Sequence, residues 1–245
     1  MYKLFSPTHL LKLNFANDSN TLDKNFYNEL LHIIGLEEVK DGGKKVIQQC
    51  KKPNYGSILE NTIDQVKTEV RLSDVANLKS FGDTREEQVY NISLELVITW
   101  INRILFLKLL ESQLISYNNS NEYKFVDIKN ITDYDSLYLL FFKVLAIKTK
   151  DRRNDIAEKY KQVPYLNSSL FEITELERQA IGINTLSNNL KLPLSSSTVL
   201  KDINGKRLSG EKEALSYLLE FLDAYNFSSE GTAQVQEDNK TLINA

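Results

Sequence analysis

A long stretch without glycine or proline, residues 84–117, dominates the sequence and carries apolar residues at helical spacing throughout. It begins with Thr84-Arg-Glu-Glu87, a capping box in which the Thr hydroxyl and the Glu carboxylate each accept a hydrogen bond from a first-turn amide. A single helix over this range is roughly 48 Å long at about 1.5 Å per residue. Because its apolar stripe extends nearly all the way round, we expect other helices to cover it on several sides.

Start and stop signals predict further helices on both sides of this one. A helix is predicted from Asp23 to Ile34, a second begins with the capping box Ser57-Ile-Leu-Glu60, and two more are predicted to be capped by Asp133 and Ser209. Gly35 is expected to end the first of these helices, because glycine readily adopts the left-handed conformation of a C-terminal cap. The charged stretch 148–161 either prolongs the helix that begins at Asp133 or starts another.

The composition favours helices over strands. Nine glycines and four prolines in 245 residues leave few tight turns for a sandwich or barrel of many short strands. We therefore predict an all-α fold, a helical bundle with one long central helix. At most one short β-hairpin is expected, near 181–197, and residues 44–50 fit either a strand or a helix.

The predicted domain organisation is one helical domain, residues 1–227, followed by a polar linker, residues 228–245, that leads toward a further domain. Residues 1–15 lack a charged segment followed by an apolar run, so we expect no targeting signal and a cytoplasmic location. The most apolar stretch, 94–110, contains Glu95, Arg103 and Lys108, whereas a bilayer span needs roughly 20 apolar residues. No membrane partner is expected.

Catalytic motifs with strict backbone requirements are missing from the sequence. No two glycines stand two residues apart, which excludes a dinucleotide-binding turn, and no Pro-Pro pair or P-loop occurs. The single cysteine, Cys50, excludes an internal disulfide and a multi-cysteine zinc site. We therefore expect no catalytic site, no bound cofactor and no metal within these residues.

Three isolated features leave chemical alternatives open. Glu38-Val39-Lys40 has the spacing of a metal-dependent nuclease core with Asp23 as its upstream carboxylate, but a solvated turn after the first helix is the favoured interpretation. His32 is interpreted as a surface or capping histidine. Cys50 is followed by two lysines that could depress its thiol pKa, but an inert thiol is favoured because no partner base is evident.

A basic cluster contrasts with the formal net charge of -3. Residues 40–52 hold five lysines and one aspartate. The candidates for contacts with a DNA phosphate backbone are Lys44, Lys45, Lys51 and Lys52, together with Arg152 and Arg153 from a second, smaller cluster. On charge alone, a solvated loop is the favoured alternative for both clusters.

Two longer stretches carry a family resemblance. Residues 96–111 (LVITWINRILFLKLLE) and 163–172 (VPYLNSSLFE) resemble the helical region that precedes the methyltransferase domain in type IIG bifunctional restriction-modification enzymes with an adenine-N6 DNA methylase. That family has an nRilFlkfLE helix followed by a PYLNgGLFe turn, in this order. The likeness covers most of residues 20–227, and it departs from the family at Ser168-Ser169, where many members have glycines.

The resemblance implies a non-catalytic connector within a larger enzyme. It implies flanking nuclease and methyltransferase domains and duplex DNA as partners, with S-adenosylmethionine and Mg²⁺ belonging to the parent enzyme. In the matching turn, four residues are expected to be structural: Pro164, Tyr165, Asn167 and Phe171. Pro fixes the start of the turn, Asn satisfies loop amides, and Phe anchors the turn in the core.

Two alternatives to the connector remain. One is the related helical region of a phage-defence DNA methyltransferase that lacks a nuclease. The other is a protein-interaction scaffold without any nucleic-acid role.

Overall fold

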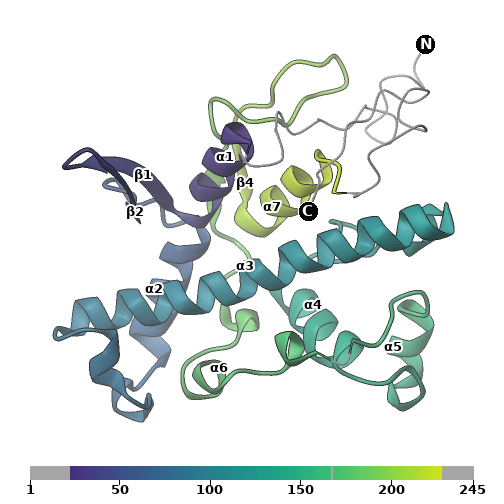
Figure 1. Ribbon diagram of the computed structural model, residues 1–245, viewed down its shortest axis with the longest axis horizontal. Coiled ribbons are helices and arrows are strands. Elements are labelled where there is room, and N and C mark those ends of the chain that lie inside the picture. Colours follow the sequence, from purple (N-terminus) through teal and green to yellow (C-terminus); the bar gives the residue numbers. More distant parts are fainter. Residues whose placement is uncertain (1–22, 167, 228–245) are drawn as a thin grey trace.

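The computed structural model describes residues 23–166 and 168–227, which form a mostly helical fold with two small antiparallel pairs of strands (Figure 1). The α-helices are α1 (Lys24–Ile34), α2 (Ile58–Glu69), α3 (Arg85–Asn118), α4 (Tyr134–Leu139), α5 (Asn154–Lys159), α6 (Glu175–Gln179) and α7 (Ala214–Asp223). The strands are β1 (Leu36–Asp41), β2 (Lys44–Gln49), β3 (Lys191–Pro193) and β4 (Glu211–Glu213). The predicted linker, 228–245, lies outside the described residues.

The long helix α3 is the central element, with α1 and α7 on one side of it and α4, α5 and α6 on the other (Figure 1). Its predicted start is confirmed, because Thr84 and Glu87 form both hydrogen bonds of the capping box. The helix runs for 34 residues and ends at Asn119, which has a left-handed conformation with φ of 49°. The bounds of α3 therefore follow from local sequence alone.

Most of the other predicted helix ends are also confirmed. Asp23 caps α1 by accepting hydrogen bonds from the amides of Asn25 and Phe26, and Gly35 ends that helix with φ of 102°. Asp133 caps α4 as predicted. The prediction for Ser209 is wrong, because strand β4 intervenes and α7 begins only at Ala214.

The prediction of an all-α fold is too simple. Strands β1 and β2 form a six-pair antiparallel hairpin over 36–49, outside the range where a hairpin was expected. Strand β3 does lie within 181–197, but its partner β4 is far along the chain rather than in a local hairpin. Residues 44–49 are a strand, which resolves the alternative left open for 44–50.

Helix α3 buries charges and exposes apolar residues. Arg103, Lys108 and Glu111 are buried, and the Arg103 residue is 0% exposed. Ile98 and Phe106, by contrast, are 49% and 41% exposed, so other elements cover α3 on several sides, as expected, but leave part of its apolar surface open. The buried charges are tolerated because each one meets an opposite charge or backbone oxygens.

The Arg103 guanidinium forms the most extensive of these contacts. Its Nη1 and Nη2 atoms bind Glu177 Oε1 and Oε2 at 2.6 and 2.9 Å, a bidentate pair. Its Nε donates to the Leu170 carbonyl at 2.6 Å, and Nη2 also donates to the Glu172 carbonyl at 2.8 Å. Trp100, which is also buried, donates its indole N–H to the same Glu177 carboxylate at 2.8 Å. The middle of α3 is thereby fixed to the start of α6.

A π-helical turn, Leu140–Leu145, continues α4 and packs aromatic rings against this ion pair. The Arg103 guanidinium carbon lies 5.6 and 5.1 Å from the ring centres of Phe141 and Phe142, within the range of cation–π attraction. Phe171 is fully buried, with its ring 6.0 Å from that of Phe141. The prediction that Phe171 anchors its turn in the core is confirmed.

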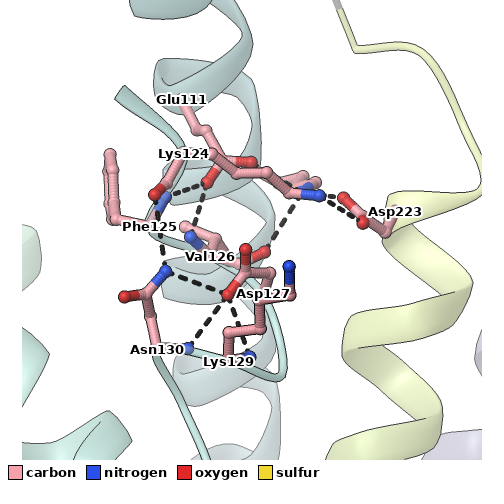
Figure 2. A network of polar contacts seen from close by, with 9 residues as sticks. Glu111, Lys124, Phe125, Val126, Asp127, Lys129, Asn130 and Asp223 are labelled. Atoms are coloured by element: carbon pink, nitrogen blue, oxygen red, sulfur yellow. Dashed lines mark hydrogen bonds and ion pairs between the residues drawn. The ribbon is translucent and has the colours of Figure 1, made fainter. Parts of the chain in front are cut away.

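A second buried network joins α3 to α7 (Figure 2). Lys108 Nζ binds Glu111 Oε1 at 2.6 Å and Asp223 Oδ1 at 2.8 Å. Glu111 Oε2 accepts the backbone N–H of Phe125 at 2.6 Å, and Lys124 Nζ binds the second oxygen of Asp223 at 2.5 Å. The network therefore ties the segment 124–126 and the end of α7 to the C-terminal half of α3.

Removal of the Glu177 carboxylate should strongly destabilise the fold. Glu177→Ala leaves the Arg103 charge and the Trp100 N–H buried without their partner, a loss of about 3–5 kcal/mol in the free energy of unfolding. The matched control is Glu175→Ala, an exposed glutamate on the same helix, which should change stability by no more than about 0.5 kcal/mol. Urea titration followed by circular dichroism measures both. A loss below about 1 kcal/mol for Glu177→Ala would contradict this role.

The Asp223 ion pairs should make stability depend on acidic pH. Burial raises the pKa of Asp223, but Lys108 and Lys124 outweigh it and lower the pKa to about 2. Since the unfolded value is about 3.9, this contribution is complete above that pH and is lost as the pH falls toward about 2. Asp223→Asn should therefore lose less stability than wild type over this interval in urea titrations. The control, Asp64→Asn at an exposed site, should keep the wild-type profile, and identical profiles for all three proteins would refute the assignment.

Candidate functional site

The hairpin of β1 and β2, here called the β1–β2 ribbon, projects from the helical body at the left of Figure 1. Gly42 and Gly43 form its two-residue turn with φ of 54° and 84°, the left-handed conformations that this tight turn requires. At its base, the Gln49 side chain donates to Glu60 of α2 at 2.5 Å. Glu60 therefore anchors the ribbon instead of completing the capping box expected with Ser57.

Lysines occupy both faces of the β1–β2 ribbon. Side chains alternate along a strand, so Lys44 and Lys45 point to opposite faces. Lys45 lies directly across from Lys40, a like-charged pair, and Lys44 lies across from Asp41. Lys45 also binds Glu38 at 2.9 Å on its own face. The predicted cluster is therefore divided between two faces and partly neutralised.

The remaining two lysines of the cluster follow the ribbon. Lys51 and Lys52 are exposed, and among the described residues neither side chain has an ion pair. The Asn54 side chain accepts the amide of Gly56 at 2.9 Å, so it stabilises the chain turn. Tyr55 is exposed beside them. The structure thus leaves Lys51 and Lys52 accessible to a partner.

The second basic cluster does not form a common surface. Arg152 is only 5% exposed, and its guanidinium donates to the carbonyls of Val144 and Val163 at 3.0 and 2.9 Å. The prediction that Arg152 contacts DNA is therefore wrong, because its side chain is buried inside the protein. Arg153 is exposed, but it binds Asp155 with its Nη2 at 2.5 Å.

The Glu38-Val39-Lys40 motif lies in strand β1, so its interpretation as a solvated turn after the first helix is wrong. The strand does not assemble the alternative nuclease core either. Asp23 uses its carboxylate to cap α1, and Glu38 binds Lys45. Throughout the described part of the chain, no group of three or more His, Cys, Asp or Glu side chains is arranged to hold a metal ion.

Cys50 and His32 have structural surroundings. Burial raises the pKa of the Cys50 thiol, and the nearby carboxylates of Glu37 and Glu60 raise it further, so the two adjacent lysines do not activate it. His32 is half-buried, and its Nε2 donates to the Pro193 carbonyl at 2.8 Å. It therefore links α1 to β3, in addition to lying in the last turn of its helix.

The turn at residues 163–172, one of the two stretches compared with the family above, lies against α3. Pro164 and Tyr165 are half-buried, and Asn167 lies outside the described residues. The Leu170 and Glu172 carbonyls of this turn accept hydrogen bonds from Arg103. The two stretches that carry the resemblance are thus in direct contact.

The main described pockets do not include the candidate lysines of the ribbon. One pocket of ≈ 270 Å³ lies between Asn61, Tyr134 and Ser216, and another of ≈ 340 Å³ lies between Lys124 and Tyr160. The candidate site is therefore a projecting surface rather than a cavity.

Comparison with known proteins places the chain in a family. It belongs to the family described as "Domain of unknown function (DUF7814)", whose model matches residues 19–243. No curated protein and no solved structure matches the sequence significantly. Among the described helices, none is both long enough and apolar enough to cross a membrane.

The raised thiol pKa predicts slow alkylation of Cys50. In the folded protein, iodoacetamide should react more slowly at neutral pH than in the urea-unfolded chain, because less thiolate is present. The rate should still be rising above pH of about 8.5, the value of a free thiol. The unfolded chain, with the same single cysteine, is the internal control. Faster reaction of the folded protein at neutral pH would show an activated thiol instead.

Proposed function

We propose that this chain is a non-catalytic helical connector of a type IIG-like restriction-modification enzyme, and that its β1–β2 ribbon contacts the phosphates of duplex DNA. The connector would link an endonuclease to an adenine-N6 DNA methyltransferase. S-adenosylmethionine and Mg²⁺ would belong to those flanking domains. One observation carries the DNA contact: the ribbon projects from the helical body, and its lysine side chains are exposed rather than packed in the core.

The charges of the ribbon favour an anionic partner. Lys40 and Lys45 face each other across the strands, and like charges in directly opposite positions destabilise a hairpin. Glu38 relieves only part of this repulsion, through its ion pair with Lys45. Within the described residues, the side chains of Lys40 and Lys44 have no ion pair. A row of phosphates would neutralise these charges, and release of counterions would favour the complex.

The shape of the ribbon also suits a duplex. A two-stranded antiparallel ribbon is narrow enough for the major groove of B-DNA, which is about 12 Å wide. If the ribbon enters the groove with one strand toward the base pairs, its two faces are directed toward the two sugar–phosphate backbones. Lys45 on one face and Lys44 on the other would then reach different DNA strands. Contacts of this kind fix position without reading sequence.

The long helix supports the connector role. Helix α3 runs for 34 residues, and its buried charges are fixed to α6 by Glu177 and to α7 by Asp223. Such a helix can act as a rigid spacer between two active sites. The family resemblance supports the same role. The same resemblance also fits the near alternative, the helical region of a phage-defence methyltransferase without a nuclease.

A protein-interaction scaffold is the second candidate, and exposed apolar residues of the ribbon favour it. Val46 and Ile47 are 42% and 51% exposed on consecutive positions of β2, and therefore lie on opposite faces. A partner strand or domain could cover either face. This candidate predicts binding that does not depend on the ribbon lysines.

The salt dependence of DNA binding tests the proposed function. The full chain should bind duplex DNA in the non-specific range of about 10⁻⁴ to 10⁻⁶ M, independent of sequence. The test variant replaces Lys44, Lys45, Lys51 and Lys52 with Gln. It should reduce the slope of log K against log salt by roughly 3 to 4, about 0.9 for each lost phosphate contact. Fluorescence anisotropy with a labelled duplex measures the slope.

A matched variant controls for the general loss of charge. It replaces four exposed lysines outside the ribbon with Gln: Lys67, Lys79, Lys129 and Lys143. This control should keep the wild-type slope. If the ribbon variant also keeps it, the lysines face only solvent, and the scaffold becomes the better description.

A further inference from the structure

A second basic projection, absent from the sequence predictions, lies between β3 and β4. Residues 200–208, here called the 200–208 loop, form a small hairpin in which the Leu208 amide donates to the Leu200 carbonyl at 2.9 Å. The loop belongs to the segment that projects at the top of Figure 1, on the same side of α3 as the β1–β2 ribbon. Two separate projections therefore extend from one side of the long helix.

The charges of the 200–208 loop repeat the arrangement of the ribbon. Lys201 and Arg207 form an antiparallel bridge, so two positive charges again face each other across the strands. Lys206 is exposed beside them. The nearby carboxylate of Asp202 accepts the amides of Asn204 and Lys206 at 2.8 and 2.9 Å, so it closes the turn. For the three basic side chains, no ion pair is found in the described part of the chain.

Helix α1 is the common support of the two projections. Its last turn leads through Gly35 directly into β1 of the ribbon. Its buried Glu29 accepts the Val199 amide at 3.0 Å and also accepts the Thr198 hydroxyl, while His32 donates to the Pro193 carbonyl. The Tyr217 hydroxyl of α7 donates to the same Glu29 carboxylate at 2.7 Å. The two projections are therefore held in a fixed relation by one helix.

The two projections concentrate positive charge on an acidic chain. The chain has 30 basic and 33 acidic residues in total. Residues 36–52 and 201–207 together hold eight of the basic and only four of the acidic ones. The rest of the chain holds 22 basic and 29 acidic residues, so the two basic surfaces stand out from a net negative remainder, which directs an anionic partner to them.

We infer that the 200–208 loop is a second phosphate-contacting element, and that it binds the same DNA duplex as the β1–β2 ribbon. This inference rests on the proposed function. Lys201, Lys206 and Arg207 supply the contacts, and α1 sets their position relative to the ribbon. Two contact sites on one rigid support engage a duplex together more tightly than either alone, because binding at the first holds the second in place.

The test compares four variants of the full chain in the same anisotropy titrations. The loop variant changes Lys201, Lys206 and Arg207 to Gln, and the ribbon variant is the one described above. A matched control changes Lys67, Lys79 and Lys129 to Gln. The loop variant should reduce the salt slope by roughly 2 to 3, and a combination of loop and ribbon variants should reduce it further. Circular dichroism checks that every variant is folded.

The outcomes separate the inference from the proposed function. An unchanged slope for the loop variant, with a reduced slope for the ribbon variant, overturns the inference alone. Unchanged slopes for both overturn both. A reduced slope for the loop variant alone overturns joint binding and the role of the ribbon. Equal reductions in the control overturn both assignments, and tighter binding of duplex RNA than of equally long duplex DNA overturns the choice of DNA.

Discussion

The buried ion pair between Arg103 and Glu177 is the interaction on which the arrangement of the helices depends. Burial of two charges is unfavourable unless hydrogen bonds satisfy them, and here the Trp100 indole and two backbone carbonyls complete the set. These contacts bring together the middle of α3, the turn before α6 and α6 itself. Residues 96–111 and 163–172 meet at this point, so both stretches carry structural residues of the core.

The sequence predicts those parts of the fold that are determined locally. The start of α3 at Thr84 follows from a capping box, and the end of α1 follows from Gly35. The β1–β2 ribbon was missed because neither of its faces packs against the core along its whole length, so it lacks the alternation of a half-buried strand. Its one clear signal is the pair of glycines after Asp41, which is typical of a two-residue hairpin turn. The pairing of β3 with β4 depends on distant residues and leaves no local pattern.

The candidate site shows the same limit. Counting charges finds the lysines at 44, 45, 51 and 52, but only strand register shows that they lie on different faces. Arg152 and Arg153 look equivalent in the sequence. In the structure, Arg152 is buried and donates to the carbonyls of Val144, 8 residues before it, and Val163, 11 residues after it. The 200–208 loop has no long run of basic residues, so counting charges along the sequence does not identify it. Its significance depends on α1, which brings it to the same side as the ribbon.

The buried charges along α3 determine which rotation and axial position the helix adopts in the fold. Apolar residues occur on nearly every side of it, so a rotation or a shift by one turn, about 5.4 Å, would change the buried apolar surface little. Such a shift would separate Arg103 from Glu177 and Lys108 from Asp223, and would leave unpaired charges in the interior. We infer that these ion pairs select a single register from several that the apolar residues alone would permit. The ion pairs therefore fix both the rotation and the axial position of this long helix.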